Sequence, residues 1–282
     1  MNKKVILVIL DGWGIPKAGE EWRSAIEAAH VPYFRELMST YPSSTLEACG
    51  RAVGLPNGQM GNSEVGHTNL GAGRVVYQEL EKINVAIEEG HLAKESVLTD
   101  AFAYAKTNGK KVHFIGLVSD GGVHSHIDHL KGLLRISANA GVENVFVHAF
   151  MDGRDCDPKS GKGFIEEIQP ILSETGAKLA SLTGRYFAMD RDKRWPRVEL
   201  AYNTLTLGSP IHSKNAADAI HEGYERNETD EFIKPTSIHD GNGKAITIQD
   251  GDAVVFMNYR SDRARQITDA LLQDNFNAFE RQ

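Results

Sequence analysis

Six arginines are concentrated in two short polar segments of a chain that is otherwise acidic. Residues 184–195 read GRYFAMDRDKRW and residues 258–266 read NYRSDRARQ, whereas the whole 282-residue chain has a formal net charge of −7. The six are Arg185, Arg191, Arg194, Arg260, Arg263 and Arg265. Arg260 and Arg263, three residues apart at the expected start of a helix, can share one face, where they oppose the helix dipole unless an anion lies between them. The spacing predicts a site for a small, doubly anionic ligand; the alternative is a solvated helix face.

A further polar segment follows an apolar run and carries side chains suited to binding and proton transfer. Residues 151–158, MDGRDCDP, place Arg154 beside Asp155. Arginine offers a bidentate fork for a carboxylate or phosphate, and aspartate can exchange a proton with a hydroxyl. A surface ion pair of low energetic value is the alternative.

The histidine-rich segment at residues 119–130, SDGGVHSHIDHL, has two interpretations. Its histidines and Asp128 could form a metal cluster, but the spacing matches none of the established metal motifs. We favour a split interpretation, in which the Gly-Gly turn exposes His124 to a ligand. His126 and His129 then face one side of the following helix.

Two motifs near the N-terminus could serve phosphate chemistry. In LDGWG, residues 10–14, Asp11 ends an apolar run and offers an oxygen ligand for a divalent cation, or forms an ordinary Asp-Gly turn. In GQMGNSEVGH, residues 58–67, Ser63 precedes a segment able to start a helix, where amide groups favour phosphate. Metal coordination can activate a serine hydroxyl, although a helix N-cap is the simpler role for Ser63.

The elements that must position these side chains alternate between strand-like and helix-like patterns, which indicates βα units and a largely parallel sheet. Strands are predicted at 5–10, 112–119, 145–150, 178–183 and 253–258. Helices are predicted around 22–39, 76–89, 126–139, 162–174, 192–206, 215–226 and 261–273. The stretch 47–74 holds seven glycines and three asparagines, which is typical of irregular structure, and a domain boundary is expected near 76–80.

The composition excludes several classes of protein. The acidic balance argues against a nucleic-acid or anionic-membrane binder. Cys49 and Cys156 form no disulfide framework or CxxC metal pair, which favours a reduced cytoplasm. The apolar run at 5–10 is too short for a signal peptide or membrane span and is better interpreted as a buried strand.

Taken in order, the six motifs resemble those of the cofactor-independent phosphoglycerate mutases from Val5 to about Gln282. This resemblance implies an α/β fold in which an alkaline-phosphatase-like phosphatase domain, incomplete here, contains an inserted α/β phosphotransferase domain. Residues 1–77 would be the N-terminal part of the phosphatase, metal-binding domain. Residues 78–282 would be the phosphotransferase, substrate-binding domain.

The same resemblance implies roles for individual residues. Asp11 would be a metal ligand, Ser63 both a metal ligand and the phosphorylated nucleophile, and Asp155 the group that moves a proton to and from the glycerate hydroxyls. The residues around the substrate would be His124, Arg154, Asp155, Arg185, Arg191, Arg260 and Arg263. The expected cofactors are two divalent ions, with manganese favoured, at a site that is incomplete in this chain, and no bisphosphoglycerate is expected.

The implied reaction interconverts 3-phosphoglycerate and 2-phosphoglycerate through a phosphoserine intermediate. The expected partner is this small substrate, with no nucleic acid or membrane, in a cytoplasmic monomer. Members of the family are longer and supply further Asp and His metal ligands after the inserted domain. Asp11 and Ser63 alone cannot fix two metals, so we expect this chain to be a fragment that is inactive alone.

Two other hypotheses remain open. A related metal-dependent phosphatase or phosphomutase would share the Asp-Gly strand end and the hydroxyl nucleophile, but it would not predict the arginines of 185–191 and 260–263. A domain that binds phosphoglycerate without turnover is compatible with the mutase hypothesis.

Overall fold

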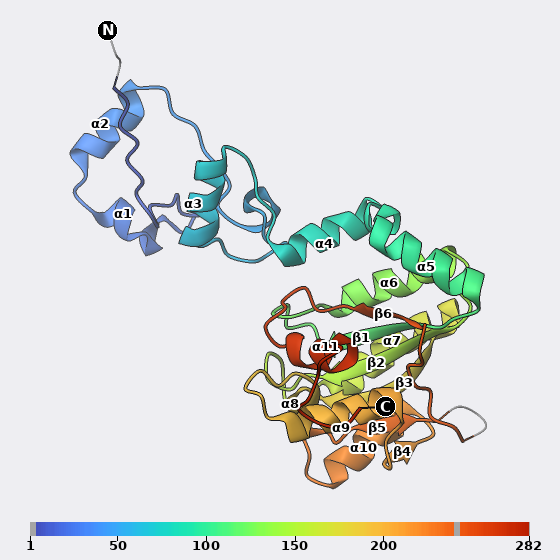
Figure 1. Ribbon diagram of the computed structural model, residues 1–282. Helices are drawn as coiled ribbons and strands as arrows, with labels where there is room; N and C mark the ends of the chain where they lie inside the picture. Colours follow the sequence, from blue (N-terminus) through green and yellow to red (C-terminus); the bar gives the residue numbers. More distant parts are fainter. Residues whose placement is uncertain (1–3, 240–242, 282) are drawn as a thin grey trace. The chain divides into compact units, whose positions relative to one another are not determined.

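A computed structural model describes residues 4–239 and 243–281 (Figure 1). The chain divides into two compact units, Met1–Gln78 and Glu79–Gln282, within the interval 76–80 where a boundary is expected. In the described ranges, none of the helices combines the length and the apolar character needed to cross a membrane.

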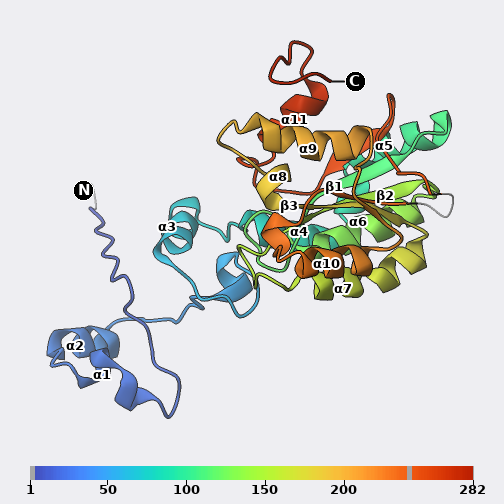
Figure 2. The same cartoon turned by 90° about the horizontal axis from the view of Figure 1, so that it is seen from below.

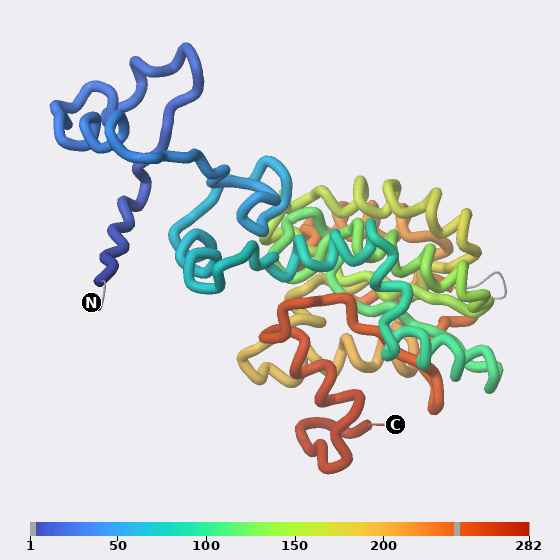
Figure 3. Tube along the Cα trace, turned by 90° about the horizontal axis from the view of Figure 1, so that it is seen from above, coloured from blue at the N-terminus to red at the C-terminus, as the bar shows by residue number. Residues whose placement is uncertain are grey.

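The second unit is built on a six-stranded sheet in the order β4-β5-β3-β2-β1-β6. The strands are β1 (Val112–Val118), β2 (Val145–Met151), β3 (Lys178–Gly184), β4 (His212–Ser213), β5 (Thr236–Ile238) and β6 (Ala253–Phe256). β1 pairs in parallel with both β2 and β6, β2 pairs in parallel with β3, and β5 runs antiparallel to β3. The chain therefore builds the sheet from β1 to β3 and later returns to the opposite side of β1 (Figure 3).

Helices cover both faces of this sheet, as Figure 2 shows for the pairs α6 and α7 against α9 and α11. The helices of the unit are α4 (Glu79–Glu88), α5 (Ser96–Asn108), α6 (Ile127–Asn139), α7 (Gly161–Thr175), α8 (Arg185–Ala188), α9 (Trp195–Thr206), α10 (Ala216–Glu225) and α11 (Arg265–Leu272). One core cluster lies between the sheet and α5, α6, α7 and α10, and a second lies between the sheet and α8, α9 and α11.

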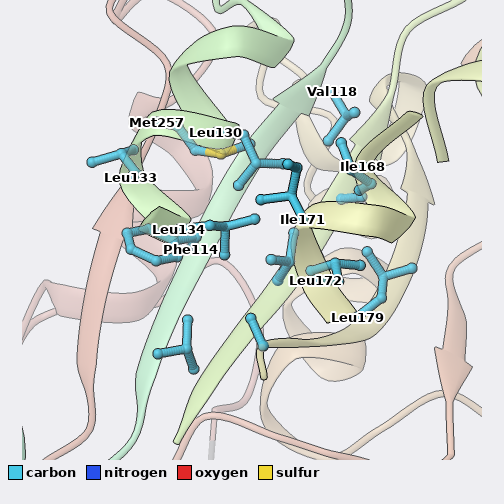
Figure 4. Close-up of a cluster of buried hydrophobic side chains, with 14 of the residues drawn as sticks. Phe114, Val118, Leu130, Leu133, Leu134, Ile168, Ile171, Leu172, Leu179 and Met257 are labelled. Atoms are coloured by element: carbon cyan, nitrogen blue, oxygen red, sulfur yellow. The ribbon is translucent and has the colours of Figure 1, made fainter. Parts of the chain in front are cut away.

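The larger core forms because the strands are apolar on both faces and the helices carry an apolar stripe. All seven residues of β1 are buried, as expected for a central parallel strand. Phe114 of β1 meets Leu130 and Leu134 of α6, and Ile168 of α7 lies beside them (Figure 4). This packing holds the strand ends that carry the polar motifs.

Most predicted elements of the second unit are confirmed, with boundary shifts of a few residues. The strands at 112–119, 145–150, 178–183 and 253–258 correspond to β1, β2, β3 and β6. Helix α5 and the short strands β4 and β5 were not predicted from the sequence. The predicted helix at 261–273 begins only at Arg265, so Arg260 and Arg263 lie in the turn before it and not on its first face.

The first unit differs more from the prediction. It contains α1 (Ala25–Ala28), α2 (Pro32–Thr40) and α3 (Ser63–Ala72). The helix expected at 22–39 is divided because Ala29 is extended and Pro32 starts a new helix. The stretch 47–74, expected to be irregular, ends in α3.

The buried strand predicted at 5–10 is wrong for this structure. Val5 is 90% exposed and Leu10 is 50% exposed, and the segment has no strand assignment. A strand needs a neighbour for its backbone N–H and C=O groups, and the described part of the chain supplies none for this segment. Its apolar side chains remain in contact with water.

A row of buried polar side chains crosses the sheet of the second unit. His113 of β1 and His148 of β2 are fully buried, and His113 Nδ1 lies 2.9 Å from His148 Nε2. At one end, His113 Nε2 lies 3.3 Å from Asp252, and at the other, His148 Nδ1 lies 2.8 Å from the Ser181 hydroxyl. Burial lowers the pKa of His113 to about 4 and that of His148 well below its usual value, so both imidazoles are neutral.

These neutral histidines make the fold sensitive to acid. Their pKa values in the folded chain lie below the value of about 6.5 in an unfolded chain, so unfolding takes up protons as the pH falls below about 6.5. We expect the unfolding free energy from urea titrations to decrease between pH 6.5 and 5. His148→Gln should reduce that slope by about 1.4 kcal/mol per pH unit.

The matched control is His221→Gln, because the His221 side chain is 69% exposed. This variant should keep the slope of the unaltered chain. An equal slope for His148→Gln would contradict the assignment of a buried, neutral His148.

Candidate functional site

The polar motifs of the second unit meet at the carboxyl ends of its parallel strands. Val118 of β1 is in register with Met151 of β2, which is in register with Gly184 of β3. The loops after β1 and β2 carry His124 and Asp155, α8 begins with Arg185 directly after β3, and the loop after β6 carries Arg260. Because β2 and β6 flank β1, the strand order reverses here, and α/β sheets bind ligands at such a switch point.

Asp152, the residue after β2, is the buried carboxylate to which several groups of the site are hydrogen-bonded. Its side chain is 1% exposed and accepts hydrogen bonds from the Arg185 guanidinium at 2.6 Å and the Ser119 hydroxyl at 2.5 Å. It also accepts the backbone N–H groups of Arg154 and Asp155. Burial alone would raise the pKa of Asp152, but these hydrogen bonds and the charge of Arg185 lower it.

Arg185 joins this buried carboxylate to the predicted proton-transfer residue. Its Nη1 lies 2.6 Å from Asp155 Oδ2 as well as from Asp152 Oδ1. Arg185 follows Gly184, the last residue of β3 and the N-cap of α8, and is the first residue of that helix, with its side chain 2% exposed. The guanidinium is therefore fixed before any ligand arrives.

His124 lies between two carboxylates. Its side chain is 3% exposed, with Nε2 3.8 Å from Asp155 Oδ2 and Nδ1 3.8 Å from Asp262 Oδ1. Burial lowers the pKa of His124, and the positive charge of Arg185 lowers it further. The neutral imidazole that results can donate one hydrogen bond through its N–H and accept another at its second ring nitrogen.

Asp262 gathers two of the predicted arginines. Its carboxylate accepts hydrogen bonds from Arg191 at 2.8 Å and from Arg260 at 2.9 Å. Burial would raise the pKa of Asp262, but the bonds from Arg191 and Arg260 lower it. Arg191 and Arg260, 69 residues apart by their numbers in the sequence, thus converge through a carboxylate that the sequence analysis did not single out.

Arg263 has a different environment from the other arginines. It donates to the carbonyl oxygen of Met189 at 3.1 Å, and in the described part of the chain no ion pair joins it to a carboxylate. Burial lowers the pKa of Arg263, as do the nearby charges of Arg185, Arg191 and Arg154. Several like charges are therefore held close together, and an anion would relieve their repulsion.

A cavity of about 440 Å³ lies among these arginines. Its lining consists of Arg154, Arg185, Tyr186, Met189, Asp190, Arg191, Asp192, Arg194, Arg197, Glu231, Phe232 and Arg263. Arg197 stacks over the Tyr186 ring at 3.7 Å, and Arg154 lies 3.5 Å from Glu231. Of the residues expected around the substrate, the cavity lining includes Arg154, Arg185, Arg191 and Arg263. His124, Asp155 and Arg260 are not part of the lining. Asp155 contacts Arg185, and Arg260 shares Asp262 with Arg191.

Several of these contributors were missed from the sequence. Asp152 stands two residues before Arg154 at a predicted strand end, so its position was a usable signal. Asp262 stands between Arg260 and Arg263, where a carboxylate could have been expected to pair with one of them. Nothing local distinguishes Glu231, since it reaches the cavity from a different part of the chain.

The two predicted residues of the first unit are both exposed. Asp11 lies in a turn closed by the Trp13 N–H and the Leu10 carbonyl oxygen at 3.1 Å. Ser63 is the first residue of α3, and the N-cap is Asn62, whose side chain accepts the Val65 N–H. The N-cap alternative for Ser63 is therefore wrong by one residue.

His67 is close to Ser63 but is not placed to act as its base. His67 Nδ1 lies 3.1 Å from Ser63 Oγ and 2.8 Å from the Ser63 carbonyl oxygen. A carbonyl oxygen only accepts, so the shorter contact puts the proton on Nδ1 and leaves no lone pair there for the hydroxyl. Any activation of Ser63 needs another group.

The described residues do not form a metal centre. No group of three or more His, Cys, Asp or Glu side chains suited to a metal is found among residues 4–239 and 243–281. This finding is also against the cluster interpretation of His124, His126, Asp128 and His129; His126 is instead the N-cap of α6. Asp11 and Ser63 offer two ligands, whereas a divalent ion takes about four or more.

Comparison with known proteins agrees with the motifs of the second unit. Residues 83–282 match the family model described as BPG-independent PGAM N-terminus. The chain is 57% identical over 277 residues to a 2,3-bisphosphoglycerate-independent phosphoglycerate mutase of Flavobacterium johnsoniae. This match covers 98% of the chain and 54% of the Flavobacterium protein. A protein of the same name from Clostridium perfringens is 50% identical and is covered to 55%.

A solved structure is similar over the same extent. The crystal structure of Leishmania mexicana phosphoglycerate mutase at low cobalt concentration matches 96% of this chain and 51% of that chain, with a TM-score of 0.73 and 34% identity. The chain thus spans about half the length of the curated relatives it matches. On this basis the chain belongs to the 2,3-bisphosphoglycerate-independent phosphoglycerate mutase family and corresponds to its N-terminal part.

Proposed function

We propose that the second unit binds phosphoglycerate in the arginine-lined cavity, as the substrate-binding, phosphotransferase part of a phosphoglycerate mutase. The observation that carries this proposal is Arg263, a partly buried guanidinium with no carboxylate partner among the described residues and three other arginines close by. Such a group is costly unless an anion is present for much of the time.

The chemistry of the site fits a ligand with a carboxylate and a phosphate. Arginine forks bind both groups through paired N–H donors, and phosphate accepts several such bonds. Arg263 supplies a guanidinium without a carboxylate partner among the described residues, while Arg191 and Arg260 both donate to Asp262. A ligand oxygen replacing Asp262 on either arginine would meet donors that are already in place.

Asp155 and His124 are the proposed groups for proton transfer. Arg185 holds Asp155 Oδ2, which lies 3.8 Å from His124 Nε2, so a glycerate hydroxyl entering between them would contact both. A positioned carboxylate can take the hydroxyl proton as that oxygen attacks phosphorus and return it when the bond breaks. The neutral imidazole can hydrogen-bond the same hydroxyl.

Ser63 is the proposed acceptor of the phosphoryl group, in an interconversion of 3- and 2-phosphoglycerate through phosphoserine. Its place as the first residue of α3 supports this role, because the free N–H groups of a helix start favour phosphate. Asp11 and Ser63 are also proposed as ligands of divalent ions, with manganese expected. The described residues do not by themselves complete such a site.

The first unit is proposed to be part of an alkaline-phosphatase-like phosphatase domain. The apolar run at 5–10, exposed by up to 90% at Val5, supports this assignment. Apolar surface in water costs roughly 25 cal/mol per Å², so pairing with a further strand would stabilise the segment. A monomeric, cytoplasmic protein remains the prediction.

The decisive experiment is calorimetric titration of the chain with 3-phosphoglycerate beside a mutase assay. We expect saturable binding without turnover. The absence of binding by a chain shown to be folded would overturn the arginine-site assignment. Turnover would show that the chain alone completes the catalytic centre.

Arg263→Gln should weaken 3-phosphoglycerate binding by about tenfold to a hundredfold, because it removes a charge-assisted donor from the cavity. The matched control is Arg135→Gln, which changes an exposed arginine of α6 paired with Glu174. Calorimetry on both variants measures the difference. Equal affinities for the two variants would contradict the central role of Arg263.

Removal of divalent metal should leave this affinity unchanged. The binding groups proposed here are arginines, His124 and Asp155, and none of them belongs to a described metal cluster. The same titration with excess chelator and with manganese measures the effect. A dissociation constant that falls tenfold or so with manganese would show a metal–substrate contact that the second unit does not explain.

A further inference from the structure

Tyr259 fastens the turn that carries His124 to the loop that carries Arg260. Its phenol donates to the Gly122 carbonyl oxygen at 2.6 Å, and its backbone N–H donates to the His124 carbonyl oxygen at 3.0 Å. The N–H of Arg260 makes a longer contact, 3.4 Å, with the same oxygen. One side chain and two amides thus join the segment after β1 to the segment after β6.

The two ends of this turn are fixed by other groups. The Gly121 N–H donates to the Ser119 hydroxyl at 3.0 Å, and the Ser125 hydroxyl donates to the Leu117 carbonyl oxygen. Between them, Gly122 adopts a left-handed φ of +65°, which suits glycine. The phenol of Tyr259 therefore acts on the middle of the turn, two residues before His124.

The Tyr259 ring is itself supported from α4. It lies 5.8 Å, centroid to centroid, from the ring of His129, whose Nε2 lies 2.9 Å from Asn84 Oδ1. Burial lowers the pKa of His129 to about 4 and raises the pKa of Tyr259 to about 12. The imidazole is therefore neutral, and the phenol keeps the proton that it donates to Gly122.

We propose that Tyr259 is a positioning residue for His124, which it holds against Asp155 and Asp262 without touching the ligand. This inference rests on the proposed function only for its effect on phosphoglycerate binding. The geometry of the turn is a property of the chain itself. It can be tested with no ligand present.

Tyr259→Phe removes the phenolic hydroxyl and leaves both the ring and the backbone N–H. The matched control is Tyr104→Phe, because Tyr104 lies on α5 and is 47% exposed. Hydrogen exchange of the amides at 121–126 should be faster in Tyr259→Phe than in the unaltered chain or the control. Equal exchange in all three would overturn the proposal.

The pKa of His124, followed by NMR titration of its ring, separates positioning from general stability. His124 faces Asp155, Asp262, Arg185 and Arg260. Release of the turn should expose the imidazole and move it away from Arg185, so its pKa should rise toward the ordinary value. A pKa unchanged from that of the Tyr104→Phe chain would contradict the assignment, whatever the melting temperature.

Binding of 3-phosphoglycerate should weaken by about threefold to tenfold in Tyr259→Phe, the effect of one hydrogen bond. If the unaltered chain does not bind this ligand, the proposed function fails, while exchange and the His124 pKa still decide the role of Tyr259. If Tyr259→Phe does not fold, an NMR measurement on the unaltered chain tests the role of Tyr259. The Tyr259 hydroxyl proton, which is donated to the Gly122 carbonyl oxygen at 2.6 Å, should then be protected from exchange with water in NMR spectra, and rapid exchange would count against the proposal.

Discussion

The arrangement of the site depends on one buried carboxylate, Asp152. It lies at the end of β2 and collects the guanidinium of Arg185, the hydroxyl of Ser119 and two backbone N–H groups of its own loop. A buried charge is tolerated only when it is paired and fully hydrogen-bonded, and these donors satisfy that requirement. These hydrogen bonds also fix the donor groups, so the loop that carries Arg154 and Asp155 has little conformational freedom.

The strand order extends this local constraint to the whole cavity. β1, β2 and β3 are laid down in succession, and β6 returns to the free side of β1. Loops from both halves of the unit then face one another over the same edge of the sheet. Asp262 joins these loops, because it pairs with Arg191, which follows β3 and α8, and with Arg260 of its own loop after β6. The cationic groups are assembled by topology and restrained by carboxylates.

The sequence was most informative where apolar runs and polar strand ends coincide. β1, β2, β3 and β6 were predicted because parallel strands buried on both faces read as continuous apolar segments. The same rule failed at 5–10, since burial there would require a neighbouring strand. β4 and β5 were too short to leave a pattern. Asp152 and Asp262 were overlooked although both stand close to predicted site residues, because they also pair with arginines from distant segments, which a linear sequence does not display.

The polar row across the sheet has a fixed direction. The Asp252 carboxylate only accepts, so the proton of neutral His113 lies on Nε2, which leaves Nδ1 to accept from His148 Nε2–H. His148 Nδ1 must then accept the proton of the Ser181 hydroxyl. The Asp252 carboxylate, directly before β6, therefore determines the tautomers of His113 and His148. It also determines the direction of the hydroxyl proton of Ser181 in β3, three strands away. Reversing any one of these bonds would require all of them to reverse together.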